Sequence, residues 1–99
     1  MMDGKRRKPP QHPSPQGQHL ATISHEGRFW EIYLEFDDDP RWPETYRARF
    51  CFAAADMDEG EEPVRTSTVI IEESYEEACR KARAFEEFQL QGFLRSTLP

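Results

Sequence analysis

The sequence predicts a small α+β domain, in which an antiparallel meander of three or four strands is covered on one face by a C-terminal α-helix (β-β-β-α). Residues 28–36 and 45–54 alternate apolar and polar side chains, and residues 64–72 are rich in β-branched ones, so all three stretches are typical of strands. A helix is indicated from Ser74, where apolar residues recur at three- and four-residue spacing. A chain of 99 residues has room for one core, which these elements are expected to share.

Residues 1–19 are expected to form a disordered tail ahead of a single domain at residues 20–99. The tail holds four of the eight prolines and, beyond its two initial methionines, no bulky apolar residue. It therefore has little to offset the entropy lost on ordering. The basic run Lys5–Lys8 gives the tail a charge of +3 (four basic, one acidic), against −9 for the rest (nine basic, eighteen acidic), which sums to the net −6. Such a run can contact nucleic acid or an acidic partner surface.

The stretch Arg28–Phe36 is the expected centre of the sheet. Its even-numbered residues from Trp30 onward fall on the face toward the core, and its odd-numbered residues fall on the other face. Leu20–Ser24 precedes it across Gly27, which readily takes the positive φ of a tight turn. That segment is either the short first strand of a hairpin, which we favour, or a bulged extension of the central strand.

Thr45–Ala54 is the expected second main strand, and its core-facing residues are Tyr46, Ala48, Phe50 and Phe52. An antiparallel pairing that places Phe36 beside Tyr46 also places Glu35 opposite Arg47 on the outer face, where opposite charges attract. A slip of this pairing by two residues would preserve the same two faces. The intervening residues 37–44 are a loop, because two prolines and three consecutive aspartates cannot continue a strand.

Val64–Glu72 is the expected third main strand, after a polar hairpin loop at residues 55–63. Ser74 and Glu77 then match a capping box, which predicts the start of a helix. Gly92 either ends or bends this helix, and the apolar residues 93–98 either continue it or pack as a tail. The stripe that covers the sheet is expected to consist of Tyr75, Ala78, Cys79, Ala82 and Phe85.

No catalytic, cofactor-binding or metal site is predicted. Nucleophilic catalysis requires a nearby base, but the three histidines lie at positions 12, 19 and 25, in the tail and the first turn. Cys51 and Cys79 lack the spaced partners of a zinc site and are expected to pack as small apolar side chains. There is no signal peptide and no apolar run of membrane-spanning length, so we expect a cytoplasmic protein without enzyme activity or membrane contact.

The outer face of the sheet is the predicted functional surface, since a single helix covers only the other face. Phe29, Tyr33, Arg47 and Arg49 are expected to share it. Trp42, in the loop, either packs on a core edge or stands out as an aromatic anchor for a partner. These residues predict a small non-catalytic protein-interaction or adaptor domain, which contacts a second copy of the chain or another protein. The alternative is a nucleic-acid-associated protein that uses the basic tail and the Arg/Tyr surface.

The order of elements, with the acidic helix start Glu73–Ala78 (ESYEEA), is similar to that of HicB-like antitoxin domains and of the shared part of double-stranded-RNA-binding domains. The resemblance is one of topology and covers roughly residues 28–90. The proline-glycine turn of HicB-like domains is absent, and so is the basic helix start that faces RNA phosphates. No functional residue is therefore transferred from either family.

Overall fold

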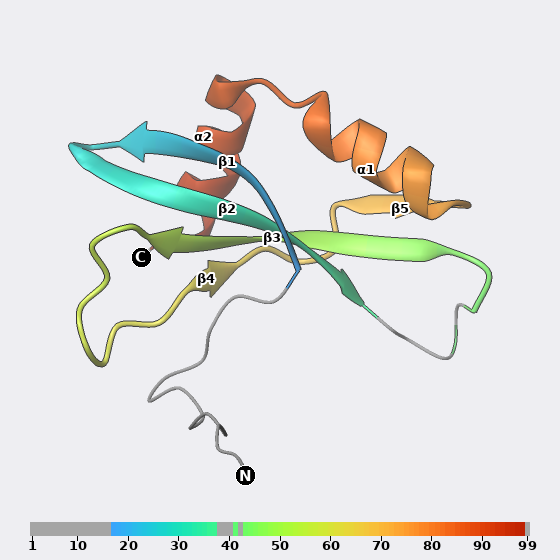
Figure 1. Ribbon diagram of the computed structural model, residues 1–99, viewed down its shortest axis with the longest axis horizontal. Coiled ribbons are helices and arrows are strands. Elements are labelled where there is room, and N and C mark those ends of the chain that lie inside the picture. The colour runs from blue at the N-terminus through green and yellow to red at the C-terminus, as the bar shows by residue number, and fades with distance from the viewer. Residues whose placement is uncertain (1–16, 38–40, 42, 99) are drawn as a thin grey trace, which may run out of the picture.

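The computed structural model describes residues 17–37, 41 and 43–98, and it has the expected α+β architecture. An antiparallel sheet is followed by two C-terminal helices, which lie on one side of it (Figure 1). The sheet order is β1-β2-β3-β4, and β5 also pairs with β3. The predictions for residues 1–16 and for Trp42 lie outside the described residues. The elements are β1 (Gln18–His25), β2 (Arg28–Asp37), β3 (Tyr46–Ala54), β4 (Val64–Arg65), β5 (Ile70–Glu72), α1 (Tyr75–Arg83) and α2 (Glu87–Thr97).

Leu20–Ser24 forms part of strand β1, so the prediction of a separate first strand is confirmed. The strand begins earlier than expected, at Gln18, and its pairing with β2 is interrupted by an irregularity between His19 and Ala21. A two-residue turn, Glu26 and Gly27, joins it to β2, with φ angles of 54° and 80°. Positive φ at both positions is what a type I′ hairpin turn requires, and the twist of that turn matches the twist of the flanking strands.

The predicted register of β2 and β3 is wrong by two residues, although the predicted faces are right. Phe36 pairs with Ala48 rather than with Tyr46. The observed register places an alanine opposite each bulky residue at the two ends of the core face, which avoids crowding two large side chains. It also makes two pairs of opposite charge on the outer face instead of one. The four pairs are Phe36–Ala48, Trp30–Ala54, Glu35–Arg49 and Asp37–Arg47.

The predicted third strand is divided into β4 and β5, and both parts pair with β3. Between the pairs Cys51–Arg65 and Ala48–Ile70, β3 advances three residues while the edge chain advances five, which leaves a bulge of two extra residues. The bulge lets the consecutive residues Val69 and Ile70 both contact the core. A straight strand could not do this, because neighbouring side chains point to opposite faces.

The single predicted helix is two helices. Ser74 caps α1 as expected, since its hydroxyl accepts a hydrogen bond from the Glu77 amide at 3.1 Å. The chain leaves the helix after Arg83, and Glu86 forms a second capping box with Gln89 that starts α2. Gly92 therefore lies inside α2 and does not end a helix.

The core lies between the sheet and the helices. Ile32, Leu34, Phe50, Phe52 and Leu94 are fully buried, and the small stripe residues of α1 allow that helix to approach the sheet closely. Tyr46, Tyr75 and Phe85 were also expected in the core, but they are less buried than expected. Tyr46 and Tyr75 are each 44% exposed, and Phe85 is only partly buried.

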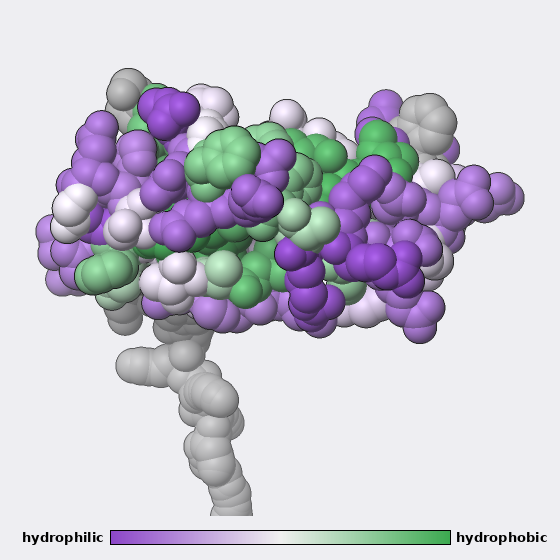
Figure 2. All heavy atoms as spheres, turned by 90° about the horizontal axis from the view of Figure 1, so that it is seen from above, coloured by the Kyte–Doolittle hydropathy of each residue, from purple (hydrophilic) through white to green (hydrophobic). Residues whose placement is uncertain are grey.

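Tyr46 and Tyr75 join Phe36 in an aromatic cluster at the α1 end of the sheet, with ring centroids 5.1 to 6.3 Å apart. From the helical side, hydrophilic residues surround a band of apolar ones (Figure 2). The aromatic cluster and Phe88 of α2, which is 66% exposed, belong to the apolar groups that remain at the surface.

Candidate partner-binding face

The outer face is the surface of the sheet that points away from α1 and α2. It is built from the residues that alternate with the core residues along the strands, and none of the described helices covers it (Figure 1). Aromatic, aliphatic and charged side chains mix on this surface. Ile71 of β5, which is half exposed and pairs with Arg47, adds an apolar residue that the sequence did not single out.

The predicted surface residues share this face but do not converge on one point. Phe29 is 63% exposed near the hairpin. Tyr33 is half-buried and makes an edge-to-face ring contact with His19, with centroids 5.3 Å apart. Arg49 lies farther along, with 45% of its side chain exposed, and Arg47 pairs with Asp37 at the far end. The four residues form a strip along the sheet.

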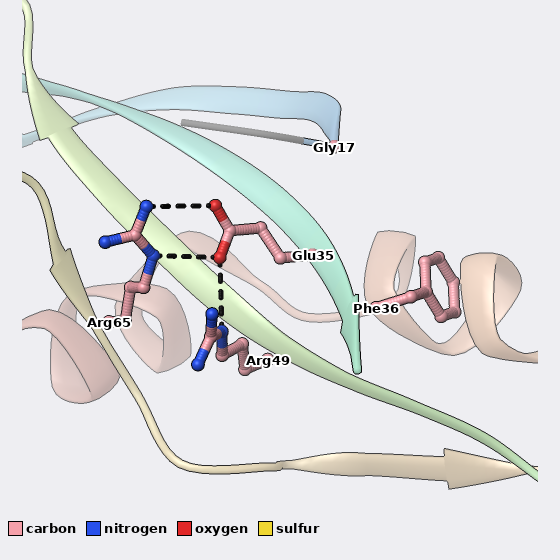
Figure 3. A pocket seen from close by; sticks show the side chains of 5 residues that line it. All are labelled: Gly17, Glu35, Phe36, Arg49 and Arg65. Carbon is pink, nitrogen blue, oxygen red and sulfur yellow. Dashed lines mark hydrogen bonds and ion pairs between the residues drawn. The ribbon is translucent and has the colours of Figure 1, made fainter. Parts of the chain in front are cut away.

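Glu35 occupies the middle of the outer face and is the principal buried charge of the described residues, only 5% exposed. Its carboxylate lies between two guanidinium groups from neighbouring strands (Figure 3). Arg49 Nε donates to Oε1 at 3.1 Å, and Arg65 donates from Nε to Oε1 at 2.9 Å and from Nη2 to Oε2 at 3.4 Å. This Glu35–Arg49–Arg65 cluster links β2, β3 and β4.

The cluster satisfies a carboxylate that would otherwise be costly to bury. Hydrogen bonds between charged groups are stronger than neutral ones, and a bidentate arginine adds directional specificity. The Glu35 carboxylate in turn raises the pKa of Arg65. Burial, reinforced by the negative charge of Glu35, raises the pKa of the neighbouring Cys51 thiol to about 11. Cys51 is therefore a protonated, inaccessible side chain at neutral pH and not a nucleophile.

A depression of about 430 Å³ adjoins the cluster and is lined by Gly17, Glu35, Phe36, Arg49 and Arg65. The Phe36 ring points away from Glu35, Arg49 and Arg65 (Figure 3). The charged side chains therefore do not stack on this ring. Gly17 has φ of +112°, and a Cβ atom there would clash with the Leu34 carbonyl oxygen. Only glycine permits the chain to cross so close to β2 at this point.

A second polar group lies beside Tyr33 on the outer face. Thr22 Oγ1 donates to Glu31 Oε1 at 2.7 Å, and His19 Nε2 lies 2.6 Å from the same oxygen. The hydrogen bond from Thr22, and then the one with His19, hold the pKa of Glu31 below its ordinary value. Glu31 is therefore ionised at neutral pH, and the outer face presents both signs of charge.

Sequence reasoning missed the grouping of Glu35 with Arg49 and Arg65. Glu35 was placed on the correct face, but the predicted register put it opposite Arg47. Arg65 lies thirty residues away in sequence, on a strand whose inward face the pattern left open. A test of the alternative register would have paired Glu35 with Arg49, and this is the signal that could have indicated the cluster.

No catalytic site is evident among the residues that the structure describes. In the part of the chain that the structure describes, no three His, Cys, Asp or Glu side chains gather as a metal site. The described helices include none that is long and apolar enough to cross a membrane. Exposed aromatic and arginine side chains, by contrast, are the types that contribute most to protein interfaces.

Comparison with known proteins gives a similarity over part of the chain. The chain is 40% identical over 57 residues to enhancer of mRNA-decapping protein 4 from Homo sapiens and from Mus musculus. The aligned part is 50% of this chain but only 4% of the length of these relatives. No family model matches the chain. No solved structure matches it either.

Proposed function

We propose that this chain is a non-catalytic protein-interaction module that binds a partner protein through the outer face. The observation that carries the proposal is the combination of Phe29, at 63% exposure, with Tyr33 and Ile71 on a sheet surface that no described helix covers. Aromatic side chains bury large areas at low entropic cost when a partner docks. The mixed charges around them favour a protein surface over a nucleic acid, because two of the arginines already bind Glu35.

The partial similarity to enhancer of mRNA-decapping protein 4 supports a more specific role. We propose that the partner belongs to the machinery of mRNA decapping and that the chain acts in the cytoplasm. Cys51 and Cys79 are both free and buried, which is compatible with a reducing compartment.

The test is the double variant Phe29→Ser with Tyr33→Ser. Truncation of central aromatic residues commonly costs about 1–4 kcal/mol of binding energy, so affinity for a partner or a second copy should fall at least roughly ten-fold. Sedimentation velocity measures self-association. Proteins captured from extract are identified, and their Kd is then measured with purified components.

Phe88→Ser is the matched control, because Phe88 is similarly exposed, at 66%, but lies on helix α2. It should bind as the parent does. Equal loss in both variants, or no loss in the double variant, would refute the outer face as the interface. Retention of the parent chain by nucleic acid but by no protein would support the nucleic-acid alternative instead.

A further inference from the structure

A second pocket lies at the opposite end of the sheet from the aromatic cluster, where the β1–β2 turn, the segment before β4 and the end of α2 meet. We call it the hairpin-end pocket. Its volume is about 450 Å³. The residues that matter for its chemistry are Glu26, Arg28, Trp30, Glu62, Val64 and Leu98.

Trp30 forms part of the wall of this pocket and has an unsatisfied hydrogen-bond donor. The residue is 6% exposed, and its indole Nε1 has no hydrogen-bond partner in the described part of the chain. An indole nitrogen can only donate, and buried donors are nearly always paired. An acceptor from outside the described residues would therefore complete this site.

The wall around Trp30 is held in place by ion pairs. The Arg28 guanidinium lies over the indole ring, 5.2 Å from its centroid. It donates from Nε to Asp56 and from Nη2 to Glu61, each at 2.8 Å. Arg28 and Glu61 therefore already bind each other, and ligand recognition falls to other charged groups of the pocket.

Two further glutamates at the pocket are not neutralised in this way. The Glu26 side chain is 84% exposed, and His25 Nε2 lies 3.9 Å from its Oε2. Glu62 is exposed, and its charge contributes to the raised pKa of Arg65, whose hydrogen bonds go to Glu35. With Glu61 they outnumber the one arginine of the lining by three to one. Residues 20–99 as a whole carry nine basic and eighteen acidic side chains, so the field of the domain also favours a cationic ligand.

We propose that the hairpin-end pocket binds a basic peptide segment of a partner protein. A main-chain carbonyl of the segment accepts the hydrogen bond of Trp30 Nε1. The aliphatic stem of a lysine or arginine packs against Val64 and Leu98, and its cationic end pairs with Glu62 and Glu26. Because Nε1 is covered in the free chain, side chains at the rim move aside when the segment enters. This site is separate from the outer face and does not depend on it.

The experiment follows the Trp30 indole N–H signal in ¹⁵N NMR spectra of the full chain, with Trp42→Phe to assign it. The probe is the capped peptide Ac-Gly-Ala-Lys-Arg-Ala-Gly-NH₂, and its control has glutamine at both basic positions. The signal should shift saturably toward the position of a hydrogen-bonded indole with the basic peptide only. Glu26→Gln and Glu62→Gln should each weaken binding by about two- to five-fold, as expected for exposed ion pairs, whereas Glu59→Gln, in the exposed loop nearby, should not.

Three outcomes would overturn the proposal. One is a Trp30 signal that does not move, and another is an equal response to the neutral peptide. The third is a Trp30 signal that shifts without any peptide when Lys5, Arg6, Arg7 and Lys8 are replaced by glutamine, since the occupant would then be the tail of the chain itself.

Discussion

Glu35 is the residue on which the middle of the outer face depends. A lone buried carboxylate would be expensive, but this one binds an arginine from each of the next two strands, Arg49 and Arg65. It therefore joins three strands through side chains in addition to the main-chain ladder. The two arginines are not equivalent, because 28% of the Arg65 side chain is exposed against 45% for Arg49.

We expect Glu35→Ala to lower the free energy of unfolding by about 1–3 kcal/mol, since both guanidinium groups lose their partner while staying partly desolvated. Arg49→Ala should cost only about 0.2–1 kcal/mol, as for an exposed ion pair. Urea unfolding followed by tryptophan fluorescence measures both. Equal costs in the two variants would show that the buried carboxylate has no special role.

At the level of elements, the aromatic contact between Phe50, Phe85 and Phe93 joins the sheet to the two-helix layer. The three ring centroids lie 5.4 to 5.6 Å apart. Phe50 is fully buried in β3, whereas Phe85 lies in the break between α1 and α2 and is only partly buried. The periodic pattern of the sequence had placed both in the core without distinguishing them.

Phe50→Ala should therefore cost about 3–5 kcal/mol, the range for removing a fully buried aromatic ring. Phe85→Ala should cost less, about 1–2 kcal/mol, because part of its surface is already in water. Thermal or urea unfolding checks the order. Phe88→Ala, an exposed change on α2, should stay within about 0.5 kcal/mol of the parent. Equal losses at positions 50 and 85 would contradict the observed burial.

For the whole molecule, stability depends on pH because folding lowers the pKa of at least two carboxylates, Glu31 and Glu61. Thr22 and His19 hold the pKa of Glu31 below its ordinary value, and Arg28 and the Asp58 amide do the same for Glu61. A carboxylate whose pKa is depressed by folding contributes stability above its unfolded pKa. This contribution is lost as pH falls through the folded pKa.

The free energy of unfolding should accordingly fall as the pH is lowered from about 5 to about 3, and the fall should be smaller in the double variant Glu31→Gln with Glu61→Gln. Urea unfolding at a series of pH values measures this slope. Glu59→Gln, in an exposed loop, is the control and should leave the slope unchanged. If the double variant loses stability with falling pH as steeply as the parent does, other carboxylates are responsible for the loss of stability in acid.

The sequence by itself determined the fold class, the two faces of the central strands and the start of the first helix. Each of these follows from a local pattern. Alternation assigns Trp30 to the core face and Tyr33 to the outer face whatever the neighbouring strand does, and Ser74 can cap a helix using only the next few amides. Interactions between residues that are close along the chain can be predicted from a single sequence.

Tertiary structure alone decided the register, the bulge between β4 and β5, and the grouping of Glu35 with Arg49 and Arg65. A slip of two residues leaves every side chain on the same face, so alternation cannot detect it. The choice rests on which side chains meet across strands: Phe36 fits beside Ala48, and Glu35 then reaches Arg49. The unpaired indole of Trp30 arises in the same way, because whether a buried donor finds an acceptor depends on groups that are distant in sequence and adjacent only in the folded chain.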